Sequence, residues 1–60
     1  MREREVLSLI VDGFSNREIG SRLSMSESTA SVHVSHILSK LGVTTRVEAA
    51  AIAIRSGLDS

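Results

Sequence analysis

The stretch that decides the fold is SNREIGSRLSMSESTASVHVSHILSKL, residues 15–41. It opens with a capping box, in which the Ser15 oxygen accepts the N3 amide and Glu18 reaches back to the cap. A helix over 16–23 follows, then the turn Ser24-Met25-Ser26, and Ser26 is a good N-cap for a helix over 27–41. A second, frame-shifted box from Ser24 to Glu27 leaves that boundary open by a residue or two. A short helix, a three-residue turn and a longer helix are typical of a helix-turn-helix.

Gly20 lies inside the shorter helix, where glycine costs about 1 kcal/mol relative to alanine. Close approach of the neighbouring segment is a physical reason for a glycine there, as expected in a helix-turn-helix. The spacing alone also fits any antiparallel pair of helices, so this alternative stays open at this point.

The flanking segments add one helix on each side. Gly13 ends the first of them near Asp12, and Thr45 with Glu48 forms another capping box that opens the last. The apolar residues of the first segment recur at spacings of three and four: Val6, Leu7, Ile10, Val11 and Phe14. The sequence therefore predicts an all-α fold, a small four-helix domain containing a helix-turn-helix, with helices at about 2–12, 16–23, 27–41 and 46–56.

Length and composition exclude several classes of protein. Sixty residues make one small domain, which buries only about 60% of its unfolded surface. The chain has no cysteine, so it can form neither a disulfide nor a cysteine-based zinc site. No apolar run approaches the roughly 18 residues of a membrane span, and we expect a cytoplasmic protein without membrane attachment. No phosphate-cradling glycine motif is present, and we expect no cofactor.

The net charge of zero is unusual for a DNA-binding domain, because phosphate neutralisation dominates the affinity of such domains. The charge is unevenly distributed. Residues 16–46 hold four cationic against two acidic side chains, whereas the rest of the chain holds three against five. The middle of the chain is therefore the part that favours an anionic partner.

Several short motifs occur together in a fixed order: Arg4-Glu5-Val6-Leu7, residues 13–19 (GFSNREI), Ser28-Thr29-Ala30, His33, Ile37, residues 40–43 (KLGV), and Arg46 with Glu48 and Ala49. As a set they resemble the LuxR/GerE (NarL-like) DNA-binding domain of bacterial transcription regulators, over essentially the whole chain. The resemblance implies a domain whose third helix enters the major groove and whose fourth helix dimerises. It also implies attachment to a sensory or receiver domain in the full-length protein. The usual Leu-Thr at the start is missing, so we expect the chain to begin just inside the domain.

The third helix is expected to bury one stripe, Ala30, His33, Val34, Ile37 and Leu41, and to present the other to double-stranded DNA. A row of serines on the outer stripe is small enough to lie close to a groove, and Val32 suits a thymine methyl group. The predicted DNA-binding residues are Asn16, Arg17, Ser28, Thr29, Ser31, Val32, Ser35, His36, Ser39 and Lys40. The resembling family often has lysine at the positions of Ser31 and Ser35, and two lost phosphate contacts would reduce the salt slope of binding by roughly 1.8.

In the fourth helix we expect an inward face of Val47, Ala50, Ala51, Ile54 and Leu58. Ala49, Ile52 and Ala53 then remain on the opposite side as the predicted contact of a weak homodimer.

Two other classes of function compete with DNA binding. An enzyme needs a pocket and an orienting third group beside a serine and a histidine, and a domain this small has little room for them. His33 and His36 stand three apart but are expected to point inward and outward, so we expect no metal site and no catalytic residue. The second alternative is a helix-turn-helix fold used as a protein-interaction or oligomerisation module with weak or lost DNA binding, which explains the neutral charge.

Overall fold

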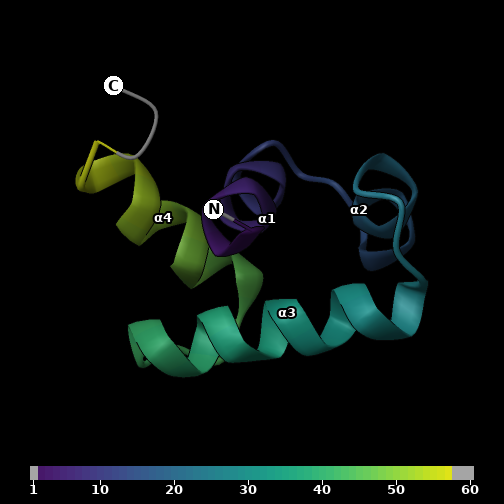
Figure 1. Ribbon diagram of the computed structural model, residues 1–60. Coiled ribbons are helices and arrows are strands. Elements are labelled where there is room, and N and C mark those ends of the chain that lie inside the picture. The colour runs from purple at the N-terminus through teal and green to yellow at the C-terminus, as the bar shows by residue number, and fades with distance from the viewer. Residues whose placement is uncertain (1, 58–60) are drawn as a thin grey trace.

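Four helices follow one another in the computed structural model, which describes residues 2–57 (Figure 1). They are α1 (Arg2–Val11), α2 (Asn16–Arg22), α3 (Glu27–Leu41) and α4 (Arg46–Arg55). The ends of α1, α2 and α4 lie one residue earlier than the sequence predicts. The predicted all-α fold is confirmed.

Each of the last three helices begins at the cap that its sequence predicts. The Ser15 hydroxyl accepts the amide of Glu18 at 3.2 Å, and the Glu18 carboxylate accepts the amide of Ser15 at 2.8 Å. Thr45 and Glu48 form the second capping box in the same way. At the start of α3 the Ser26 hydroxyl accepts the amide of Thr29 at 3.1 Å, which fixes the boundary at Ser26. These bonds satisfy amides that a helix leaves without a partner at its first turn.

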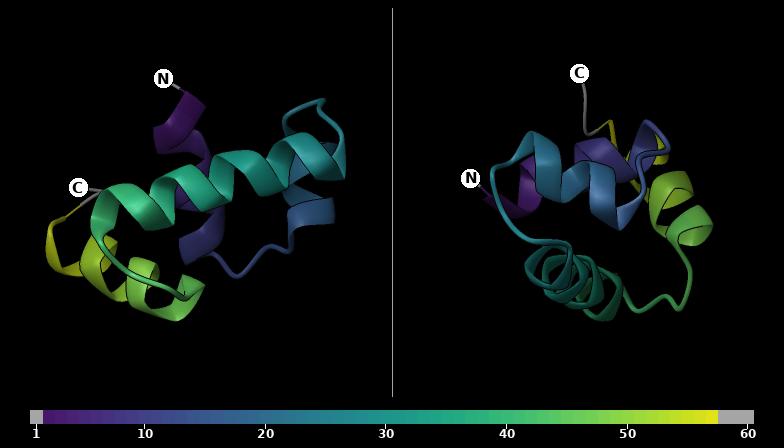
Figure 2. Two further views of the ribbon diagram at one scale, coloured as in Figure 1. Left: turned by 90° about the horizontal axis from the view of Figure 1, so that it is seen from below. Right: turned by 90° about the vertical axis from the view of Figure 1, so that its right-hand side faces the viewer.

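The helices are arranged so that one face of α3 stays uncovered. In Figure 1, α3 lies across the bottom of the view, with α2 above its first turns and α1 above its middle. Seen from below, α3 lies in front of the other helices (Figure 2, left). The chain then turns back at Gly42, whose φ of 70° is left-handed, and α4 packs beside α1.

The core lies between α1, α2 and α3. Its buried residues are Val6, Ile10, Ile19, Ala30, Val34 and Ile37, and half-buried apolar residues, Leu23 and Leu41 among them, pack around them. Within the predicted inward stripe of α3, Ala30, Val34 and Ile37 are buried, and His33 and Leu41 are half-buried. The prediction for the inner face of this helix is confirmed.

Gly20 is buried where α2 meets the turn that leads into α3. A Cβ atom at this position would lie 2.7 Å from the Met25 carbonyl oxygen and 3.1 Å from that of Ser26. The predicted close approach is confirmed, and the neighbour is the backbone of the turn. Ser24, in the same turn, has a φ of 58°, which is left-handed.

The predicted faces of α4 are wrong at most positions, although Ala50, predicted to face inward, is half-buried. Ala49 and Ala53, predicted as the dimer contact, are 0% and 2% exposed, and Ile52 is half-buried. Val47 and Ile54, predicted to face inward, are 78% and 66% exposed, and Ala51 is also exposed. Leu58 lies outside the described residues. Alanine on the inner face lets α4 approach α1 closely. The rotation of α4 is therefore set by this packing and not by burial of its largest side chains.

Candidate nucleic-acid interface

The uncovered face of α3 gathers most of the predicted DNA-binding residues. Ser28, Thr29, Val32, Ser35, His36, Ser39 and Lys40 are all exposed, and Ser31 is half-buried. Val32 is 53% exposed and is the large apolar side chain of this face. Apart from Val32, His36 and Lys40, its side chains are those of serine and threonine, which are short and let the backbone of α3 come close to a surface of complementary shape.

The first turn of α3 is held by hydrogen bonds that involve a predicted contact residue. The Ser26 hydroxyl donates to Thr29 Oγ1 at 2.9 Å and accepts the Thr29 amide. Thr29 Oγ1 therefore has a fixed position at the amino end of the helix, where the helix dipole favours a negative ligand.

Three cationic side chains of α2 and α3 have different surroundings. Arg17, on the first turn of α2, is exposed and has no ion-pair partner among the described residues. The Arg22 guanidinium lies 4.5 Å from the centre of the Phe14 ring, a cation–π distance. Lys40, at the end of α3, donates to the Glu3 carboxylate at 2.8 Å. Arg17 is therefore the cation best placed to meet a phosphate without first leaving a partner.

Arg46 forms a structural contact with the backbone of a distant residue. Its Nη1 donates to the carbonyl oxygen of Phe14 at 2.8 Å, and the side chain is half-buried. This bond ties the first residue of α4 to the loop between α1 and α2. No local signal in the sequence indicates it, because the two residues are 32 positions apart and the acceptor is a backbone atom.

Asn16, the first residue of α2, is half-buried, and its Oδ1 atom is enclosed without a hydrogen-bond partner in the part of the chain that the structure describes. A buried amide oxygen without a donor costs free energy. Asn16 therefore differs from the freely exposed residues of α3, and its contact with DNA stays a prediction.

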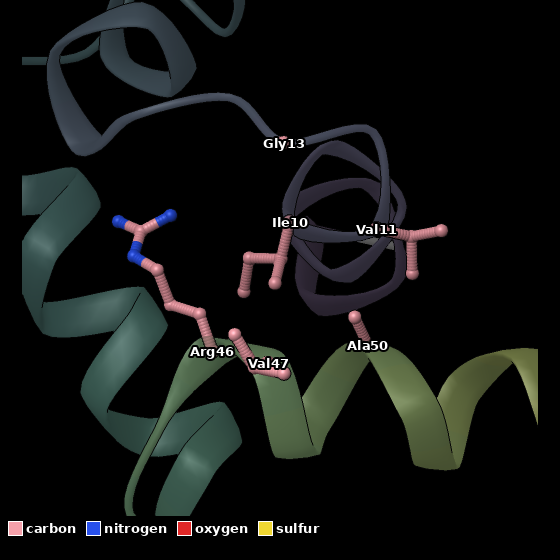
Figure 3. Close-up of a pocket in the computed structure, with 6 residues that line it drawn as sticks. All are labelled: Ile10, Val11, Gly13, Arg46, Val47 and Ala50. Carbon is pink, nitrogen blue, oxygen red and sulfur yellow. The ribbon is translucent and has the colours of Figure 1, made fainter.

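An open, mainly apolar depression of about 330 Å³ lies away from α3, between α1 and α4. Ile10, Val11 and Gly13 line one side, and Arg46, Val47 and Ala50 line the other (Figure 3). The guanidinium of Arg46 turns away from Val47 and Ala50, towards its backbone acceptor. The depression is a surface feature of the α1–α4 contact and holds no pair of groups suited to acid–base chemistry.

Among residues 2–57 no group of three or more histidine, cysteine, aspartate or glutamate side chains is placed to hold a metal ion. No helix in this described range is both long and apolar enough to cross a membrane.

The comparison with known protein families agrees with the arrangement of α2 and α3. The model of the family described as "Bacterial regulatory proteins, luxR family" matches residues 1–53. The chain belongs to the LuxR family. The resemblance read from the short motifs is thereby confirmed, and so is the class of DNA-binding transcription regulators with a helix-turn-helix.

Curated relatives of this LuxR-family domain are regulators. It is 50% identical over 56 residues to the transcriptional regulatory protein DegU of Brevibacillus brevis, which covers 93% of the chain and 24% of DegU. It is 51% identical over 49 residues to the nitrate/nitrite response regulator protein NarL of Escherichia coli K12, covering 82% of the chain and 23% of NarL. The transcriptional regulatory protein LiaR of Bacillus subtilis is 46% identical over 57 residues, covering 95% of the chain and 27% of LiaR. The LuxR-family domain thus spans about a quarter of the length of these relatives.

Proposed function

We propose that this domain binds double-stranded DNA with α3 in the major groove, as the reading part of a bacterial transcription regulator. The observation that carries the proposal is the uncovered face of α3, which presents serine and threonine side chains together with Val32, His36 and Lys40. Serine hydroxyls can donate to phosphates and base edges directly or through water, and Val32 can contact a thymine methyl group. Asn16 and Arg17 would add backbone contacts from the start of α2.

Binding should depend on salt less steeply than in a strongly basic domain. The exposed cations of α2 are Arg17 and Arg22, and neither forms an ion pair within the described residues, although Arg22 lies over the Phe14 ring. Serine occupies positions 31 and 35 in the middle of α3. Each neutralised phosphate contributes about 0.9 to the slope of log K against log salt. Few such contacts mean a shallow slope and an affinity that depends on dimerisation and on the rest of the parent protein.

The test is fluorescence anisotropy of a labelled duplex, titrated with the domain at low and at physiological salt. We expect binding that weakens with salt. Arg17→Ala should weaken it further and reduce the slope by about 0.9, whereas the matched change Arg55→Ala, at the end of α4, should leave the slope nearly unchanged. A folded domain that does not bind duplex DNA even at low salt would contradict the proposal.

We further propose that α4 is the contact of a weak homodimer, through Val47, Ala51 and Ile54. These exposed residues are spaced by four and three positions and form one apolar stripe. A two-fold dimer would suit half-sites about one DNA turn apart. In sedimentation of the domain on a two-half-site duplex, Ile54→Asp should abolish the cooperative formation of the two-to-one complex and leave the affinity of the one-to-one complex unchanged.

The relatives also suggest the setting of the domain. Because they are about four times longer than the matched chain, we propose that it acts within a longer cytoplasmic regulator that carries a sensory or receiver domain.

A second function is favoured by two observations, the net charge of zero and the apolar stripe on α4. Both suit a domain that docks onto another protein. Such a module would show no salt-sensitive affinity for generic duplex DNA, so the same titration separates the two functions.

A further inference from the structure

Lys40, the cationic residue near the end of α3, forms an ion pair with a carboxylate of the same chain. Lys40 Nζ and Glu3 Oε1 lie 2.8 Å apart, with 69% and 42% of the two side chains exposed. Glu3 belongs to the first turns of α1, 37 positions away. The ion pair therefore bridges two helices at the edge of the uncovered face of α3.

Glu3 stands beside a row of α3 side chains that includes more than Lys40. The hydrogen bond from Lys40 and its charge hold the pKa of the Glu3 carboxyl below its ordinary value, against a smaller opposing effect of desolvation. The charges of His36 and His33 lower this pKa further, and their effects are the smallest. His36 and Lys40 are exposed and four positions apart, so they lie on one side of the helix, and the half-buried His33 lies between this side and the inner face. Glu3 thus places a carboxylate beside this side of α3.

The pair is not required by the packing beneath it. Val6, one turn further along α1, is fully buried and anchors the helix to the core. An ion pair between exposed side chains contributes little to stability, because water and salt screen it and both side chains lose freedom. The position of the pair at the rim of the candidate interface suggests a role in binding.

We propose that Glu3 acts as an internal competitor of DNA: its carboxylate takes the place of a backbone phosphate on Lys40 and so lowers the affinity of the domain for duplex DNA. Lys40 paired with Glu3 is neutral as a unit and releases no counterion when it meets a phosphate. To contact DNA, Lys40 must first leave Glu3, and the carboxylate then stays near the negatively charged backbone. This inference rests on the proposed DNA binding and assigns a regulatory role to a residue of α1 outside the helix-turn-helix.

The size of the effect follows from the charge that is released. A Lys40 side chain freed to neutralise one phosphate steepens the slope of log K against log salt by about 0.9. Between 0.05 and 0.2 M salt, the ratio of the DNA affinity of a domain with a free Lys40 to that of the wild type should therefore fall by about 3.5-fold. Glu3→Gln keeps the size of the side chain and removes the charge, so it should bind DNA more tightly than the wild type, most clearly at low salt.

The experiment is a salt series of anisotropy titrations with a generic duplex for the wild type, Glu3→Gln, Lys40→Gln and the double variant. Asp12→Asn is the matched control, since it removes one exposed negative charge at the other end of α1. We expect Glu3→Gln to steepen the slope by about 0.9 and Asp12→Asn to leave it nearly unchanged. In the Lys40→Gln background, Glu3→Gln should gain no more affinity than Asp12→Asn does.

Several outcomes would overturn the inference. If Glu3→Gln binds like Asp12→Asn, the carboxylate does not compete, and if it binds more weakly than the wild type, Glu3 positions Lys40 for DNA. In both cases the wild type still binds, so the proposed function survives. If neither the wild type nor Glu3→Gln binds at low salt while both are folded by circular dichroism, the proposed function fails and the inference falls with it. Carbon-detected NMR adds a direct readout, in which the pKa of Glu3 should rise when DNA takes Lys40 away.

Discussion

Replacing Gly20 by alanine tests the packing that holds the two helices of the helix-turn-helix together. The new Cβ would meet the Met25 carbonyl oxygen at 2.7 Å and the Ser26 carbonyl group at 3.1–3.2 Å, whereas ordinary contacts of this kind lie at 3.4–4 Å. All three atoms belong to the backbone of the turn, so no side chain can rotate away. The turn must move by several tenths of an ångström, together with the start of α3.

Two opposing effects decide the magnitude. Alanine in place of glycine inside a helix gains about 1 kcal/mol from intrinsic propensity. Forcing an extra methyl group into a packed site costs about 1–3 kcal/mol, and a rigid backbone neighbour favours the upper part of that range. We therefore expect Gly20→Ala to lower the free energy of unfolding by about 1–2 kcal/mol. A domain of this size has a total stability of about 3–9 kcal/mol, so the loss is readily measured.

The assay is urea denaturation followed by circular dichroism at 222 nm. Ser21→Ala is the matched control: it changes the next residue, which is exposed, and should stabilise the domain by about 0.5 kcal/mol through propensity alone. If Gly20→Ala were as stable as the wild type, or gained as much as Ser21→Ala, the close approach of the turn would not be the reason for glycine at this position.

Three further changes test other parts of the fold. Arg46→Met should lower the stability by about 2 kcal/mol, because a half-buried carbonyl loses its charged donor at 2.8 Å, and Arg46→Lys should not restore it in urea denaturation. Ala53→Leu should cost about 1–3 kcal/mol and Ala51→Leu less than about 0.5 kcal/mol in the same assay, since the first is 2% exposed and the second is on the open side of α4; equal costs would contradict the rotation of that helix. The capping hydrogen bonds from Thr44 and Thr45 lower the pKa of Glu48 below 4.5, so its contribution to stability is present above pH 4.5 and is lost as the pH falls through the lowered value. In thermal melts between pH 3 and 6, Glu48→Gln should therefore lose less stability on acidification than the wild type. An equal loss in the two proteins would show that this cap does not contribute to the pH dependence of stability.

The parts of the fold that the sequence predicts well are those with a local cause. Each capping box is written in four consecutive residues, and both form the expected pair of hydrogen bonds. The inner face of α3 follows from an apolar period of three and four, which leaves one choice of rotation. The close approach at Gly20 can be predicted from the sequence, because glycine inside a helix lowers its stability and a packing contact is a reason for its presence.

The rotation of α4 has no such local cause. Seven of its ten residues are alanine, isoleucine or valine, so apolar positions occur on both sides of the helix and the period is ambiguous. The sequence argument placed the bulkier side chains inside. In the structure the buried positions are Ala49 and Ala53, because α4 lies close to α1 and because Arg46 and the Thr45 cap fix its first turn.

The candidate site shows the same division. The exposed serines of α3 follow from its period, whereas the Glu3–Lys40 pair joins residues 37 positions apart on the surface. Exposed charges have many possible partners, and only the tertiary arrangement of α1 over α3 selects this one.

The measurement that tests the central claim most directly is a titration of the ¹⁵N-labelled domain with a duplex, followed by amide chemical shifts at low salt. If α3 reads the major groove, the largest changes should fall on exposed residues between Ser28 and Lys40 and at Arg17, with small changes at Ile10 and Val11 on the α1 side of the α1–α4 depression. Changes confined to α4, or no changes in a folded domain, would contradict the account.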